Sequence, residues 1–202
     1  MLTPRPVQAL HGSIPFHDLD HSELVVVARI AKAAALTPRH SFSFDETALL
    51  EELKVRAKSL PPESRLGMIR QVAGNFAAEE ALSGLFSREE EDHLAADALA
   101  RTIAWPIVSS RLRSRLIGLL IARRDGSAPV DSLGLDLLFR VFPQVTAHDA
   151  RATLFVVLDR KLDELFKKGN SSRVEELFDQ VMSECPDHQA VRAFLDRFSR
   201  EA

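Results

Sequence analysis

Apolar residues recur at steps of three and four throughout this sequence, and this spacing limits the fold more than any other feature. Such a period places the apolar side chains on one face of an α-helix, whereas a half-buried strand alternates apolar and polar residues. No segment alternates over more than a few residues. We therefore expect an all-α fold of roughly eight to ten helices, arranged as a multi-helix bundle or a short α-solenoid.

The middle of the chain, residues 87–126, is expected to form the centre of that fold. Ser87 and Glu90 have the spacing of a capping box, in which hydroxyl and carboxylate satisfy each other's backbone donors. Pro106 lacks an amide donor and clashes with the preceding turn, so it should kink the helix at Trp105 or break it tightly. We expect a central kinked helix, with the Trp105 indole largely buried at the bend.

Caps, prolines and apolar stripes indicate the other helices. Asp20 with Glu23 and Ser43 with Glu46 have capping-box spacing. The expected helices cover residues 21–36, a segment from Ser43 to just before Pro61, a segment starting at Pro61-Pro62 and closed near Gly84, then 131–142, 147–168 and two helices within 171–199.

The same signals suggest how the chain divides. Residues 1–19 contain Pro4, Pro6, Gly12 and Pro15, so we expect a flexible N-terminal arm without a regular element of useful length. A helical core should follow over residues 20–124. The Gly- and Pro-containing break that starts at residue 125 should separate it from a C-terminal helical region, residues 125–202, which packs on the core as one domain.

Composition excludes several classes of protein. A chain of 202 residues that is 46% hydrophobic can bury a sizeable core without a metal or disulfide staple. The only cysteine, Cys185, cannot form an intramolecular disulfide, so we expect a reducing cytoplasm. A net charge of −3 gives no global attraction for nucleic acid. Arginines interrupt the apolar run after Trp105, so we expect no membrane span.

The sequence motifs give little support for a catalytic site or a metal site. The chain contains no glycine-rich phosphate loop, no paired Cys-x-x-Cys and no His-Glu-x-x-His. Cys185 lies in an apolar stripe and is interpreted as an inert small hydrophobe. The acidic residues 89–92 with His93 could bind a metal or act as acid and base, but they suit a solvated first helical turn. We expect no catalytic residue, cofactor or metal.

A second group of possible metal ligands lies near the N-terminus. His11, His17 and His21 stand beside Asp18 and Asp20, and imidazole and carboxylate together can hold a metal. His17 and His21 would share a helix face only if the helix reached back to residue 17. Because Asp20 is the expected cap, solvated histidines near a helix start are the preferred interpretation.

Residues near the C-terminus resemble a known repeat family. Gly169-Asn170, Val174, Phe178, Val181 and Pro186-Asp187 look like the second half of a tetratricopeptide repeat. The resemblance covers about residues 155–199, and it implies a pair of short antiparallel helices. The window one period of about 34 residues upstream shows no matching pattern, so we expect a single unit.

This helix pair supplies the first hypothesis for a binding surface. Phe178 and Phe194 lie at the centre of two apolar stripes, so one side of the pair should dock on the rest of the domain. If the pair acts like a tetratricopeptide unit, the remaining surface should engage an acidic or carboxylate-bearing partner segment. Its expected partner-binding residues are Arg173, Arg192 and Arg197.

An alternative binding surface follows Trp105. Arg111, Arg113 and Arg115 could bind a nucleic-acid backbone, a phospholipid head group or an acidic partner, because guanidinium groups recognise phosphate and carboxylate bidentately. Salt bridges to neighbouring acidic helices are the ordinary interpretation.

Function hypotheses of three classes remain. The preferred one is a helical protein–protein interaction module, an adaptor or regulatory subunit that binds another protein or its own copy. An all-helical regulator that binds nucleic acid or anions through the arginine set is the alternative. An unrecognised enzyme is the third.

Overall fold

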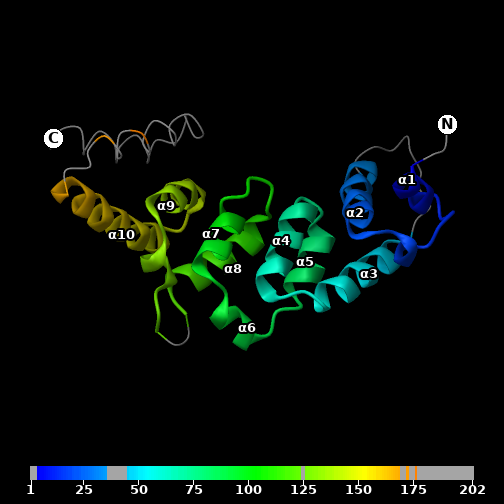
Figure 1. Cartoon of the computed structure of the whole chain (residues 1–202), viewed down its shortest axis with the longest axis horizontal. Helices are drawn as coiled ribbons and strands as arrows, with labels where there is room; N and C mark the ends of the chain where they lie inside the picture. The colour runs from blue at the N-terminus through cyan, green and yellow to red at the C-terminus, as the bar shows by residue number, and fades with distance from the viewer. Residues whose placement is uncertain (1–3, 36–44, 124–125, 169–171, 173–175, 177–202) are drawn as a thin grey trace. The chain divides into compact units, whose positions relative to one another are not determined.

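The structure, a computed structural model, describes residues 4–35, 45–123, 126–168, 172 and 176 (Figure 1). Over these residues the chain forms ten α-helices and three short 3-10 helices, without a strand. The predicted all-α fold is confirmed. No helix in the described ranges is both long enough and apolar enough to cross a membrane.

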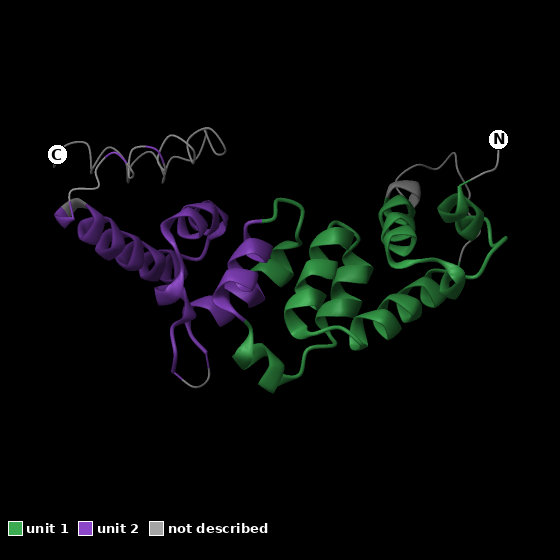
Figure 2. Ribbon diagram, in the orientation of Figure 1, with its two compact units in different colours: residues 1–94, 105–113 green, residues 95–104, 114–202 purple. Residues whose placement is uncertain are grey.

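The chain divides into two compact units (Figure 2). Unit 1 comprises residues 1–94 and 105–113, and unit 2 comprises residues 95–104 and 114–202. The predicted boundary at residue 125 is therefore wrong. Gly126, with φ of 79°, instead makes a tight turn inside unit 2, where its amide donates to the Arg123 carbonyl.

Unit 1 is built from short helices. They are α1 (Arg5–Leu10), η1 (Phe16–Asp18), α2 (His21–Ala35), α3 (Glu46–Lys58), α4 (Pro62–Val72), α5 (Phe76–Ser83) and α6 (Arg88–His93). Helix α1 packs on α2, α3 packs on η1 and α5, and α4 packs on α2 and α5. Leu24, Leu49 and Leu53 are completely buried in this unit.

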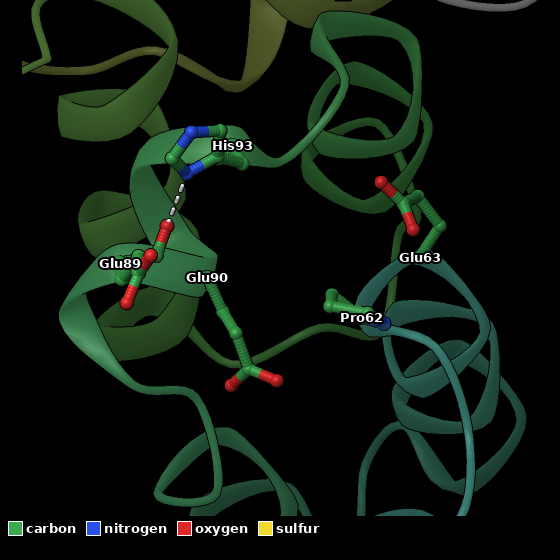
Figure 3. Close-up of a pocket in the computed structure, with 5 residues that line it drawn as sticks. All are labelled: Pro62, Glu63, Glu89, Glu90 and His93. Carbon is green, nitrogen blue, oxygen red and sulfur yellow. Dashed lines mark hydrogen bonds between the residues drawn. The ribbon is translucent and has the colours of Figure 1, made fainter.

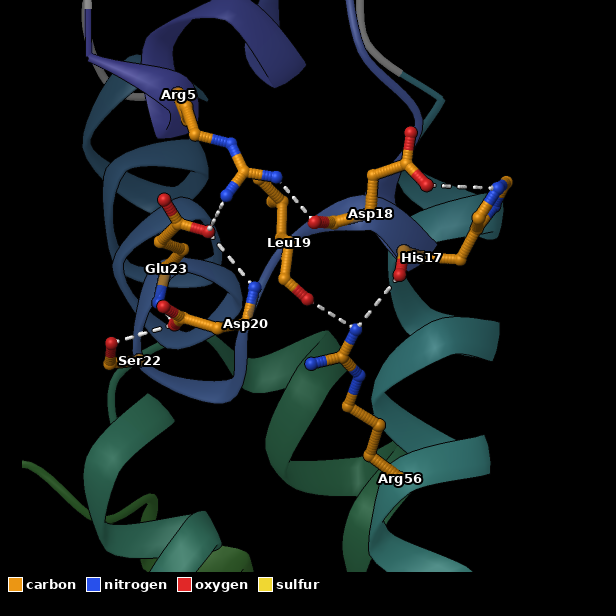
Figure 4. A network of polar contacts seen from close by, with 8 residues as sticks. All are labelled: Arg5, His17, Asp18, Leu19, Asp20, Ser22, Glu23 and Arg56. Atoms are coloured by element: carbon orange, nitrogen blue, oxygen red, sulfur yellow. Dashed lines mark hydrogen bonds and ion pairs between the residues drawn. The ribbon is translucent and has the colours of Figure 1, made fainter.

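The prediction of an irregular N-terminal arm is wrong for residues 4–19. Pro4 and Pro6 stand at the start of α1, where a missing amide donor costs nothing. Leu10 is completely buried, and Phe16 is nearly so. Figure 4 shows that Arg5 donates to the Asp18 carbonyl and pairs with Glu23 at 3.3 Å. This segment is thus part of unit 1.

Two of the three predicted capping boxes are confirmed. The Asp20 amide donates to the Glu23 carboxylate over 2.9 Å, and the Glu23 amide donates back to Asp20 over 2.8 Å. Ser87 and Glu90 form the second box, at the start of α6. Ser43 lies outside the described residues, and α3 is capped instead by Asp45, which accepts from the Ala48 amide.

The helix expected from Pro61 to Gly84 is two helices. Helix α4 starts at Pro62 as predicted but ends at Val72, because Gly74 adopts φ of 93°, a left-handed conformation that favours glycine. Asn75 then caps α5. Phe76, whose spacing from Leu66, Ile69 and Val72 would continue the apolar stripe of a single helix, is 66% exposed.

The expected central kinked helix is three helices. They are α6, α7 (Ala96–Ile103) and α8 (Ser110–Ile121). Pro106 lies in the irregular segment between α7 and α8, so it breaks the helix. Trp105 is 43% exposed, and the prediction of a largely buried indole is wrong. Leu112, Leu116 and Leu120 recur at steps of four and so share one helix face, and all three are buried.

Unit 2 contains α7, part of α8 and the elements that follow: η2 (Pro129–Ser132), α9 (Leu135–Val141), η3 (Phe142–Gln144) and α10 (His148–Lys167). Helix α9 packs against α7 and α10. Leu99, Leu138 and Leu154 are completely buried. The helix expected over 131–142 is therefore shorter, with 3-10 turns on both sides.

Most of the tetratricopeptide-like segment lies outside the described residues. This applies to Arg173, Phe178, Cys185, Arg192, Phe194 and Arg197. The corresponding predictions remain predictions.

Candidate functional site

Large apolar side chains are exposed at one junction of unit 1. Phe76 is 66% exposed, Ile107 is 51% exposed and Trp105 is 43% exposed. Phe76 is the first residue of α5, whereas Trp105 and Ile107 belong to the segment between α7 and α8. All three belong to unit 1.

A buried carboxylate joins these two parts of the chain. Glu79 is 1% exposed. Its Oε1 accepts from the Gly74 amide over 2.6 Å, and its Oε2 accepts from the Ser109 amide over 2.9 Å. Gly74 is two residues from Phe76 and Ser109 is two residues from Ile107, so Glu79 links the two backbone segments that carry the exposed apolar side chains.

The turn that carries Phe76 is fixed by further contacts with α2. The Asn75 side chain accepts from the Ala78 amide over 3.1 Å and donates to the Ala28 carbonyl over 3.0 Å. Gly74 has φ of 93°, a conformation that favours glycine, and the Lys32 ammonium nitrogen lies only 2.4 Å from where a Cβ would stand. The turn has little freedom to move.

The segment that carries Trp105 is also bonded through its backbone. The Arg113 Nη2 donates to the Trp105 carbonyl over 3.0 Å and to the Pro106 carbonyl over 3.1 Å. Val108, by contrast with its neighbours, is only 4% exposed and anchors the segment. Burial lowers the pKa of Arg113, and the nearby Glu79 charge acts in the opposite direction. The backbone is held while Trp105 and Ile107 face solvent.

The junction also gathers charged side chains. Arg111 Nη1 lies 3.0 Å from Glu80 Oε1, and their side chains are 88% and 71% exposed. The Lys32 ammonium lies 5.9 Å from the centroid of the Phe76 ring. We call the set Lys32, Phe76, Glu80, Trp105, Ile107 and Arg111 the Trp105 surface.

Only two of the three predicted arginines belong to unit 1, which carries the Trp105 surface. Arg111 and Arg113 belong to unit 1, whereas Arg115 belongs to unit 2, is exposed and has an interaction partner. Sequence reasoning missed Phe76, Glu79 and Ile107. The Pro106 break was a usable signal for Ile107, since loops between helices lie at the surface. The residues next to Glu79 in the sequence do not indicate that its side chain is buried.

A cavity of about 340 Å³ lies beside α6 (Figure 3). It is lined by Pro62, Glu63, Glu89, Glu90 and His93. The His93 Nδ1 is 2.7 Å from the Glu89 carbonyl oxygen, an arrangement within a single helix. No three metal-ligating side chains converge anywhere in the described part of the chain.

Glu90 in this cavity is engaged in holding the fold. Its carboxylate lies 3.0 and 2.9 Å from the two terminal nitrogens of Arg65. The hydrogen bond from Arg65 lowers the pKa of Glu90, and the Ser87 amide lowers it further. A general acid at neutral pH needs a raised pKa, so Glu90 is unsuited to that role.

The N-terminal histidines do not gather around a common point. A cavity of about 360 Å³ includes His17 in its lining. His17 Nε2 lies 3.5 Å from its neighbour Asp18, whereas His21 Nε2 lies 3.1 Å from Gln71 Oε1. The preferred interpretation of these residues, as surface groups near a helix start, agrees with these contacts.

Comparisons with known proteins do not assign a function to this chain. No protein family, curated protein or solved structure matches the chain. The Trp105 surface and the two cavities are therefore the features from which a function can be argued.

Proposed function

We propose that this protein is a helical protein–protein interaction module that binds its partner at the Trp105 surface. The supporting observation is the exposure of Trp105, Phe76 and Ile107 beside one bonded junction. Tryptophan and other large apolar residues dominate the binding energy of protein interfaces. Exposing three of them together is costly in water unless a partner covers them.

The rigidity of the junction supports the same proposal. Binding is weakened by the entropy lost when loops and side chains become ordered. Here Arg113 already holds the backbone at Trp105 and Pro106, and Glu79 holds it at Ser109, through hydrogen bonds. A partner would therefore meet a surface whose main chain needs little further ordering.

Anion binding by Arg111, Arg113 and Arg115 has less support. Arg111 is paired with Glu80, and Arg113 donates to two main-chain carbonyls. An anion would have to replace these partners. The predicted surface at Arg173, Arg192 and Arg197 remains a second place for a partner, and a cytoplasmic location remains part of the proposal.

Comparing exposed apolar residues of similar accessibility tests the proposal. Val55 on α3 is 61% exposed and belongs to the same unit, so Val55→Ala is a matched control for Trp105→Ala. Partners captured from the source cell should be lost with Trp105→Ala and kept with Val55→Ala, while both variants keep the wild-type helical content. Identical partner lists for the three proteins would contradict the proposal.

A further inference from the structure

Lys32 occupies an unusual place at the edge of the Trp105 surface. It projects from α2 to the Gly74 turn, and its ammonium group stands over the Phe76 ring at 5.9 Å. A cation over an aromatic face is attracted by the negative face of the ring. The contact places a positive charge directly beside an exposed apolar anchor.

The cations in and beside this surface differ in their partners. Arg111 is paired with Glu80, and Arg113 donates to the carbonyls of Trp105 and Pro106. Within the described residues, Lys32 makes no hydrogen bond or ion pair, and its ammonium group contacts the Phe76 ring. An ammonium group has three donors, and those of Lys32 are available to a ligand.

The charged side chains around Lys32 include more cations than acids. Lys32, Arg111 and Arg113 carry positive charge, whereas the nearby acids are Glu79 and Glu80. Glu79 is buried and both its oxygens accept main-chain amides, and Glu80 faces Arg111. The surface thus offers a positive charge next to Phe76 that no acid of the junction neutralises.

We propose that the partner inserts an amphipathic segment whose apolar residues cover Phe76, Trp105 and Ile107 and whose carboxylate binds Lys32. This inference rests on the proposed function and specifies the chemistry of the partner. A second copy of this chain fits less well. A two-fold contact would place the same cationic surface against itself, and like charges facing each other oppose binding.

Selection from a random peptide library displayed against the full-length protein tests this inference and requires no identified partner. Enriched peptides should combine large apolar residues with aspartate or glutamate. A synthetic peptide from the selection should bind about tenfold more weakly to Phe76→Ala and to Trp105→Ala. Because both side chains are exposed, the variants should keep the wild-type circular dichroism spectrum, and Val55→Ala should bind like the wild type.

A double-mutant cycle measures how much the peptide carboxylate contributes to binding through Lys32. Lys32→Gln should weaken the acidic peptide about fivefold, the size of an exposed ion pair. The same peptide with its acid replaced by the amide should bind wild type and Lys32→Gln equally. The fivefold difference should shrink as salt is raised.

The outcomes separate this inference from the proposed function. Peptides that need Phe76 and Trp105 but show no coupling to Lys32 would overturn the inference and leave the interaction module standing. Peptides insensitive to Phe76 and Trp105, or no enriched peptide at all, would overturn both. Dimerisation of the wild type that Trp105→Ala abolishes, seen by sedimentation, would assign the surface to a second copy and overturn the acidic partner.

Discussion

Two junctions of unit 1 each contain a charged side chain that bonds main-chain groups, and they differ in how the charge of that side chain is balanced. Arg65 donates through Nε to the carbonyls of Ala57 at 3.1 Å and Leu60 at 3.0 Å, and its terminal nitrogens pair with Glu90. Glu79 accepts the amides of Gly74 and Ser109 and has no ion pair among the described residues. One junction contains an ion pair, and the other contains a buried carboxyl group held by main-chain amides.

The difference predicts unequal costs of removing each charge. The side chains of Arg65 and Glu90 are 11% and 29% exposed, so water can reach part of the group left behind. The Gly74 amide that binds Glu79 lies in a buried residue. Leaving a buried donor without an acceptor costs its full desolvation penalty, whereas a group that can turn to water loses less. Removing Glu79 should therefore be the more damaging change.

The largest effect is expected for Glu79→Ala, which should lower the free energy of unfolding by about 2 to 5 kcal/mol because two amides lose their acceptor. Urea denaturation measures this. Glu79→Gln, which keeps one acceptor oxygen, should lose less. Glu80→Ala is the control, since that side chain is 71% exposed and should cost less than about 0.5 kcal/mol. Equal midpoints for Glu79→Ala and Glu80→Ala would remove the distinction between the junctions.

Arg65→Ala should come next, with a loss of about 2 to 3 kcal/mol from hydrogen bonds that involve a charged group. Arg65→Lys keeps the charge but not the planar fork, so it should restore only a small part of this loss. Thermal unfolding of both variants is the measurement. Full recovery by lysine would mean that charge alone, without the directed bonds to Ala57 and Leu60, holds this junction.

The pH dependence of the stability of Glu90→Gln tests the role of the charge in the Arg65–Glu90 junction. The lowered pKa of Glu90 means that its ionised form stabilises the folded state. This contribution is present above the unfolded carboxyl pKa of about 4.3 and is lost as the pH falls through the lower folded value. Glu90→Gln should be less stable than the wild type at pH 7, and the difference should vanish near pH 2. A difference that persists unchanged in acid would show that the charge is not its cause.

The smallest effect on stability is expected for Trp105→Ala. A tryptophan buried at a helix bend would cost about 3 to 5 kcal/mol on truncation, but an exposed one should cost less than about 0.5 kcal/mol. Acrylamide quenching of the only tryptophan in the chain should approach that of the unfolded protein. Strong protection from the quencher, together with a large drop in stability, would place the indole in the core.

The sequence predicts those parts of the fold whose interactions join residues only a few positions apart. The capping boxes at Asp20 and Ser87 each join residues three positions apart, so the sequence window contains both partners. The start of α4 at Pro62 has an equally local cause. By contrast, the sequence pattern suggests Pro4 and Pro6 as breakers, although proline is favoured in the first helical turn that they occupy.

The candidate surface depends on contacts that no local window contains. Glu79 meets an amide 30 residues away, and Arg65 meets a carboxylate 25 residues away. Burial of Trp105 is expected because it is apolar and single, but the bonds that fix its segment involve the backbone and leave the ring outside. Phe76 falls on the apolar stripe of the preceding helix only if that helix continues through Gly74, where the left-handed turn ends it.

The interleaved order of the two units has a consequence for synthesis on the ribosome. Unit 1 is completed by residues 105–113, which are translated after residues 95–104 of the other unit. Until Ser109 leaves the exit tunnel, the nascent chain carries a Glu79 carboxylate with only the Gly74 amide to bind. Vectorial folding of the first half therefore stops before the Ser109 hydrogen bond and the Arg111–Glu80 ion pair can form, and a chaperone that held the nascent chain at this stage would meet Phe76 before Trp105 and Ile107 had emerged.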